Sequence, residues 1–121
     1  MIQKVNAWFK LLRIPNLFTV PGGTAAGYIL NGGEDLQQGV ILSTTALLIY
    51  SAGLLLNDFS DIDEDRAHRP ERPLPSGDVM PATVLSISVL FVFLGIAAAF
   101  FAGGMRTALT ASLLVGFVVL Y

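Results

Sequence analysis

Charged residues interrupt this chain at only a few places, and long uncharged segments lie between them. No charge occurs in residues 14–33, 36–57, 79–105 or 107–121. The first three of these runs reach the roughly 18–20 residues that a helix needs to cross a hydrocarbon core ~30 Å thick. A soluble fold of 121 residues has no interior large enough to hide four such segments. The pattern therefore predicts an all-α fold, a polytopic bundle of transmembrane helices.

The boundaries of the expected elements follow from the lengths of these runs. Residues 79–105 would form a helix of ~40 Å, longer than one straight crossing requires, so we expect a turn within 101–107. Residues 107–121 reach only ~22 Å, which predicts a truncated fourth span and an N-terminal fragment of a longer bundle. The expected elements are an interfacial helix (1–13), span 1 (14–32), span 2 (39–56), a polar loop (57–78), span 3 (80–102) and a partial span 4 (106–121).

The first 13 residues combine apolar positions at helical spacing with lysines, as in a helix that lies at a membrane surface. The same lysines before an apolar run are also compatible with a signal peptide. Pro15 and Pro21 interrupt that apolar run and further spans follow it, so we expect the segment to be retained. Pro21 is expected to kink span 1.

Composition strengthens the membrane interpretation. Only 13% of residues are charged, about half of the ~25% typical of soluble domains. The absence of cysteine excludes disulfides and thiolate sites, and no basic face with interleaved aromatic residues indicates nucleic-acid binding. Basic residues favour the cytoplasmic side of membrane proteins, so we expect a multi-pass protein of the plasma (inner) membrane whose polar loop is cytoplasmic. If the N-terminus is inside, six of the seven basic residues lie on the cytoplasmic side and only Arg106 lies on the other. The six are Lys4, Lys10, Arg13, Arg66, Arg69 and Arg72.

The stretch "NDFSDIDED" concentrates negative charge at the end of span 2. If the helix continues, Asn57, Asp58, Asp61 and Asp65 fall within an arc of about 100°, while Asp63 points to roughly the opposite side. Like charges so close together repel one another, and a bound divalent cation is the simplest remedy. Oxygen ligands without His or Cys favour Mg²⁺ or Ca²⁺ over zinc.

The residues that follow favour Mg²⁺ with a diphosphate. An EF-hand calcium loop fails, because Arg66 replaces the turn glycine and Arg72 replaces the bidentate Glu. Arg69 and Arg72 have the guanidinium groups that match phosphate oxygens in a bidentate way. The alternative is a solvated loop of mutual salt bridges, but the helical register and the membrane-edge position favour a functional cluster. His68 is expected to be a solvated loop residue, and Arg13 and Asn16 are candidates to face a cavity.

Three stretches together resemble the UbiA superfamily of intramembrane prenyltransferases. "NDFSDIDED" (57–65) matches the first aspartate-rich motif of that family, N-D-x-x-D-x-x-x-D, and "RPERPLPSG" (69–77) is similar to the segment that follows it in many members. "LLRIPNLFT" (11–19) is similar to the start of their first helix. The second aspartate-rich motif and roughly the latter half of the bundle are absent from this sequence.

The resemblance implies Mg²⁺-dependent transfer of a polyprenyl group from a polyprenyl diphosphate to a lipophilic, aromatic acceptor within the lipid bilayer. Carried onto this chain, it implies that Asn57, Asp58, Asp61 and Asp65 hold the metal, with the three aspartates as the catalytic residues. Asn57, Arg69 and Arg72 would contact the diphosphate. With one metal-binding loop and an incomplete cavity, the 121-residue chain alone is predicted to lack transferase activity.

Two other functions remain open. One is a membrane protein that binds or transports divalent cations, although such a protein should carry acids at bilayer depth and the three full spans have none. The other is a UbiA-like protein without catalysis. Besides a quinone precursor such as hydroxybenzoate, a tetrapyrrole or a glycerophosphate ether lipid is compatible with the motif as acceptor. Prenyl chain length and oligomeric state are not encoded in these stretches.

Overall fold

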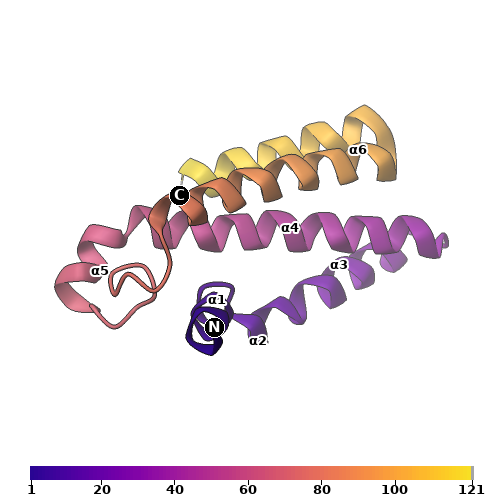
Figure 1. Cartoon of the computed structure of the whole chain (residues 1–121). Coiled ribbons are helices and arrows are strands. Elements are labelled where there is room, and N and C mark those ends of the chain that lie inside the picture. Colours follow the sequence, from indigo (N-terminus) through magenta and orange to yellow (C-terminus); the bar gives the residue numbers. More distant parts are fainter. Residues whose placement is uncertain (121) are drawn as a thin grey trace.

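The computed structural model describes residues 1–120, which form α-helices and loops without any β-strand. The predicted all-α class is thus confirmed. The helices in chain order are α1 (Ile2–Leu11), α2 (Ile14–Leu17), α3 (Thr19–Leu30), α4 (Leu36–Ser60), α5 (Ile62–His68) and α6 (Pro81–Leu120), as Figure 1 shows.

The centre of the molecule is α4 with the two arms of α6. The backbone of α6 leaves the helical region at Gly103 and at Gly104, whose φ of 69° and ψ of −155° are accessible to glycine and strained for other residues. The chain reverses there, and residues 81–102 and 105–120 run beside α4 in Figure 1. The turn expected within 101–107 is confirmed at these two glycines.

Close contacts between α4 and α6 depend on small residues. A Cβ atom added at Gly95 would lie 3.0 Å from Cγ1 of Ile49, and one added at Gly53 would lie 2.8 Å from Cγ1 of Val118. Ile49 is buried together with Ala99 and Ala111 from the two arms of α6. Small residues at such positions allow helix backbones to approach closely.

The N-terminal segment differs from the single span expected over residues 14–32. It is divided into α2 and α3 at Phe18, and α3 has only 12 residues. The break lies just before Pro21, whose ring excludes the hydrogen bond that a continuous helix would make at that position. Both Pro15 and Pro21 therefore lie in the first turn of a helix.

Two helices, α4 and α6, are long and apolar enough to cross a membrane by length and composition. Large apolar side chains on α6, including Phe93, Phe101 and Phe117, are exposed. The expected total of three full spans and a partial fourth stays a prediction, and Tyr121, at the end of that fourth span, lies outside the described residues.

The junction between α4 and α5 positions the polar residues of the predicted loop. Asp61 departs only slightly from helical geometry, with φ of −86° and ψ of 5°, so α5 nearly continues α4. α5 ends at His68, because Arg69 precedes Pro70 and adopts a non-helical conformation. The following segment folds back, and its Leu74 and Val79 are buried against α1 and α4.

Candidate functional site

Asp58 and Asp65 form the centre of a charged cluster at the end of α4. They are seven residues apart on a nearly continuous helix, so their side chains emerge on the same face. Two backbone hydrogen bonds maintain this register: Asp61 N–H donates to the carbonyl of Asn57 at 2.9 Å, and Asp65 N–H donates to that of Asp61 at 2.8 Å. Asp58 is 8% exposed and Asp65 is 3% exposed. Carboxylates this buried require cationic or hydrogen-bonding partners.

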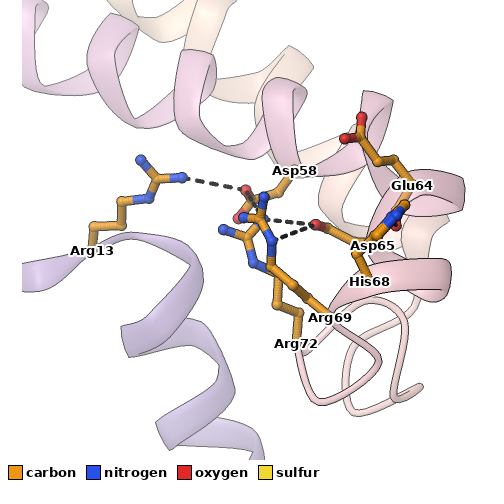
Figure 2. Close-up of polar contacts among 7 residues, drawn as sticks. All are labelled: Arg13, Asp58, Glu64, Asp65, His68, Arg69 and Arg72. Atoms are coloured by element: carbon orange, nitrogen blue, oxygen red, sulfur yellow. Dashed lines mark hydrogen bonds and ion pairs between the residues drawn. The ribbon is translucent and has the colours of Figure 1, made fainter.

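Arg72 supplies the principal partner by contacting both carboxylates. Its Nη1 atom donates a hydrogen bond to Oδ2 of Asp65 at 2.6 Å and lies 3.6 Å from Oδ1 of Asp58 (Figure 2). The hydrogen bond to Asp65 raises the pKa of the Arg72 guanidinium above its ordinary value, so this residue stays charged. We call this three-residue arrangement the Arg72 bridge.

The backbone around Arg72 is held in place by local contacts. Arg72 N–H donates to the carbonyl of Arg69 at 3.1 Å, and Ser76 N–H donates to the carbonyl of Arg72 at 2.9 Å. Leu74, two residues on, is buried in the cluster that also contains Leu11 of α1 and Leu55 of α4. The segment after α5 therefore places the Arg72 side chain against the helix that carries both aspartates.

Arg13 reaches the same site from the N-terminal segment. Its Nη2 atom lies 3.6 Å from Oδ1 of Asp58, as Figure 2 shows. Arg13 adopts a left-handed conformation, with φ of 47° and ψ of 55°, between α1 and α2. A non-glycine residue in this region is uncommon and costs of order 1–2 kcal/mol. The change of direction at Arg13 separates α1 from the helices that follow.

A cavity of about 250 Å³ lies beside these charged groups. Its lining combines the basic residues Lys10, Arg13 and Arg72 with the acidic residues Asp58, Asp65 and Glu71, next to Leu11, Pro73, Leu74 and Pro75. Arg69 is more peripheral, since its Nε atom is 3.9 Å from Oδ1 of Asp65 and its side chain is half exposed. The arginine side chains that pair with Asp58 and Asp65 can bind a phosphate group once they are released from these carboxylates.

The four residues of the predicted metal arc do not all face this cavity. Asp58 and Asp65 line it, whereas Asn57 and Asp61 are exposed. Asn57 instead lines an apolar groove of about 530 Å³ between α4 and the second arm of α6. The other lining residues of that groove are Tyr50, Gly53, Leu54, Phe117, Val118 and Leu120.

The remaining charged residues of α5 lie at the surface. Asp63 pairs with Arg66 at 3.0 Å, and both side chains are exposed. His68 is exposed, and its Nδ1 atom lies 3.1 Å from the carbonyl oxygen of Glu64, one helical turn before it. The expectation that His68 is a solvated residue agrees with its exposure.

The residues present do not form a magnesium site in this arrangement. Their oxygen donors are of the type that Mg²⁺ prefers. Within residues 1–120, however, no three Asp, Glu, His or Cys side chains are grouped closely enough to hold one ion. The two buried carboxylates face the Arg72 guanidinium instead. The donor chemistry fits the predicted metal, but the geometry does not.

Sequence reasoning missed Lys10 as a cavity residue and named Arg13 only as a candidate. The positive charge of Lys10 was visible, but it was assigned to the membrane surface. Asn16, the other candidate, is exposed and is not among the residues that line this cavity. The left-handed joint that aims Arg13 at Asp58 has no local signal, because Arg is not a residue that favours this conformation.

Comparisons with known proteins identify relatives for most of the chain. A family model described as the UbiA prenyltransferase family matches residues 18–121. A digeranylgeranylglyceryl phosphate synthase of Methanocaldococcus jannaschii is 26% identical over 102 residues, which are 83% of this chain and 36% of that protein. The protein of the same name from Methanoculleus marisnigri is 33% identical over 88% of this chain and 35% of its own length.

A third relative of that name, from Ignicoccus hospitalis, is 32% identical over 76% of this chain and 30% of its own length. The chain thus spans about a third of the length of the curated relatives it matches. No solved structure gives a significant match.

Proposed function

Because this chain belongs to the UbiA prenyltransferase family, we propose that it carries the diphosphate-binding region of an enzyme that transfers a prenyl group within the membrane. The observation that carries the proposal is the charged cavity of Asp58, Asp65, Arg13 and Arg72 at the end of an apolar helix. A prenyl diphosphate has the same two parts, an anionic head and an apolar tail.

The proposed roles follow from where each residue lies. Arg72 and Arg13 bind the diphosphate oxygens in the cavity, and Arg69, at its edge, assists them. Asp58 and Asp65 orient these guanidinium groups through the ion pairs described above. Asp61 and Asn57 lie exposed on the same helix, outside the charged cavity, and are not assigned to the arginine cluster.

The apolar groove between α4 and the second arm of α6 is the proposed place for the prenyl chain. Its volume of about 530 Å³ and its lining of aliphatic and aromatic side chains suit a hydrocarbon tail. Asn57 lies in its lining, and the next residue, Asp58, belongs to the charged cavity. The two sites therefore meet within one turn of α4, as the two parts of one substrate require.

For the acceptor we propose a glyceryl phosphate lipid, which replaces the aromatic acceptor favoured from the motif. The support is the name shared by the three relatives, digeranylgeranylglyceryl phosphate synthase. Nothing in these comparisons supports an aromatic acceptor. A glyceryl phosphate acceptor carries its own anionic group, which suits a site with three arginines.

A requirement for Mg²⁺ is part of the proposal only as a property of the complete protein. The family resemblance and the oxygen donors support it. Because the described side chains do not form a three-ligand group, the roles above are assigned to the arginines and aspartates alone.

The family and the two long apolar helices indicate an integral membrane protein. We further propose that the segment from Asn57 to Asp78 faces the cytoplasm and that the membrane is the plasma (inner) membrane. The support is the placement of six of the seven basic residues in the N-terminal segment and this loop.

We also propose that residues 1–121 alone do not transfer prenyl groups. Both the charged cavity and the apolar groove are open at the surface of the described helices, and a reactive prenyl cation needs a water-excluding site. The 121-residue chain, purified in detergent with labelled prenyl diphosphate and each acceptor, should give no product above the enzyme-free rate. Measurable product would refute this point.

The test of the function uses the open reading frame that encodes this chain, expressed to its stop codon in membranes. Labelled geranylgeranyl diphosphate is supplied with either a glyceryl phosphate lipid or hydroxybenzoate. We expect product with the former and at least a ~100-fold loss in the variant Asp58→Asn/Asp65→Asn, a size typical of removing one essential charged contact. The control Asp63→Asn alters an exposed residue and should keep the activity. Product with hydroxybenzoate alone would overturn the acceptor, and no product with either would overturn the function.

A further inference from the structure

The oxygen donors of Asp58 and Asp65 suit Mg²⁺, but their arrangement does not form a site for it. The cause is the position of one side chain, that of Arg72. Nη1 of Arg72 is 2.6 Å from Oδ2 of Asp65 and 3.6 Å from Oδ1 of Asp58. A Mg²⁺ ion would bind such oxygens at ~2.1 Å. An ion shared by these two carboxylates would therefore occupy nearly the same place as the guanidinium group.

Charge makes simultaneous occupation unfavourable. Two carboxylates already face three guanidinium groups, from Arg13, Arg69 and Arg72, at distances of 2.6 to 3.9 Å. A divalent cation added to this cluster would meet an excess of positive charge at short range, where Coulomb repulsion in a partly buried site is strong. The ion can bind well only if at least one guanidinium leaves.

Arg72 is the group that has to leave, because among the three arginines it is the one that contacts both carboxylates. Its side chain is 29% exposed, whereas those of Asp58 and Asp65 are 11% and 5% exposed. The guanidinium thus covers the carboxylates on the side of the 250 Å³ cavity that all three residues line. Its backbone is fixed by hydrogen bonds and by the burial of Leu74, so the movement is confined to the flexible side chain.

We propose that Arg72 is a built-in competitor of the divalent cation: it occupies the position between Asp58 and Asp65, and a cation engages these carboxylates only when Arg72 moves away. The released guanidinium is then free for an anion in the same cavity. This inference rests on the proposed function for the identity of that anion, but the competition itself is a property of the chain and is measurable without any reaction.

The experiment measures binding of Mn²⁺ alone, as a paramagnetic substitute for Mg²⁺, to the 121-residue chain in a neutral detergent. Arg72→Gln removes the competing charge and is expected to bind Mn²⁺ about tenfold more tightly than the unchanged chain. One neighbouring opposite charge has an effect of roughly this size on the proton affinity of a carboxylate. Free Mn²⁺ is quantified from its electron paramagnetic resonance signal.

Two variants separate this competition from other effects. Arg66→Gln removes one positive charge from the same helical segment, but its partner is the exposed Asp63, so the Mn²⁺ affinity should stay unchanged. Asp65→Asn combined with Arg72→Gln removes a proposed ligand and should abolish the gain. If Arg72→Gln does not give a monodisperse, helical sample, Arg72→Lys replaces it. The shorter ammonium group cannot contact both carboxylates as the guanidinium does, so a smaller gain is expected.

Equal Mn²⁺ affinity in the unchanged chain and in Arg72→Gln or its replacement overturns the inference, and so does an equal gain in Arg66→Gln. Absence of Mn²⁺ binding in every variant also overturns it, while prenyl transfer by the complete protein is judged separately in its own assay. Conversely, a tenfold gain in the 121-residue chain, together with no transferase activity of the complete protein, supports the competition and rejects the proposed function.

Discussion

The two ends of α4 are both anchored by polar side chains, but by chemically different ones. At its start, Tyr28 Oη donates a hydrogen bond to Oε1 of Gln38 at 2.8 Å, and Nε2 of Gln38 donates to the carbonyl of Ala102 at 2.7 Å. At its end, Asp58 and Asp65 contact Arg13 and Arg72 through charge. The bonds from Tyr28 to Gln38 and from Gln38 to Ala102 form a neutral network beside one acidic helix cap, Asp35, whose Oδ1 accepts from Gln38 N–H at 3.0 Å. The contacts at the other end are ionic.

The difference indicates which end is structural and which can change. Each neutral hydrogen bond has a single donor and a defined acceptor, and together they tie α3, α4 and the turn of α6. In the ionic end, charges exceed what the contacts need, because three arginines share two buried carboxylates. The charged side chains can exchange their partners for an ionic ligand, whereas the groups of the neutral network carry no charge that would attract one.

The largest predicted effect concerns the ionic end. Arg72→Ala leaves the two buried carboxylates without their main partner, and we expect a loss of about 2–3 kcal/mol in the free energy of unfolding, below the range for fully buried pairs because Arg72 is partly exposed. Unfolding by sodium dodecyl sulfate in mixed micelles measures it. Added Mg²⁺ should restore part of the loss in this variant. A loss below about 0.5 kcal/mol, the size of an ordinary surface substitution, would contradict the importance of the Arg72 bridge.

The second effect concerns the turn at the neutral end. Gly104→Ala places a Cβ atom on a backbone with φ of 69° and ψ of −155°, and should lower the free energy of unfolding by about 2 kcal/mol. Gly116→Ala is the control, because a Cβ atom there meets no other atom within 4 Å. The same micellar unfolding assay applies. Equal stability of the two variants would show that the α6 reversal does not depend on Gly104.

The third prediction separates strain from charge at Arg13. Arg13→Gly and Arg13→Ala both lose the contact with Asp58, but only glycine accepts a φ of 47° without strain. Arg13→Gly should therefore be more stable than Arg13→Ala by about 1 kcal/mol. The reverse order of the two unfolding midpoints would mean that the left-handed joint is not retained in solution.

The smallest effect tests the neutral network itself. Tyr28→Phe removes the hydroxyl that binds Gln38 and accepts from Asp35 N–H, and should cost about 1 kcal/mol. This loss should be the same at low and high salt, while the loss in Arg72→Ala should shrink as salt screens the remaining charges. Tyr50→Phe serves as control, because no hydrogen bond of its hydroxyl occurs among the described residues. A strong salt dependence in Tyr28→Phe would remove the distinction between the two ends.

Much of the fold was predictable because its signals are local. Uncharged runs predicted α4 and α6, and the excessive length of residues 79–105 predicted the reversal that occurs at Gly103 and Gly104. The helix expected over residues 14–32 is interrupted at Phe18, because Pro21 cannot make the hydrogen bond of a continuous helix and lies instead in the first turn of α3. That this segment crosses the membrane as one span stays a prediction. Two prolines were visible, but whether each kinks a helix or begins a new one depends on the neighbouring backbone.

The sequence by itself determined the charged content of the site and the angular order of its residues, because helical spacing places Asn57, Asp61, Asp65 and Asp58 on one arc. Only the tertiary structure decided which edge of that arc is covered. The segment after α5 and the helix α1 pack against the edge with Asp58 and Asp65. Asn57 is left facing the apolar groove. The physical reason is that helical periodicity fixes relative angles along one element, while the burial of Leu11 and Leu74 decides which angle meets Arg13 and Arg72.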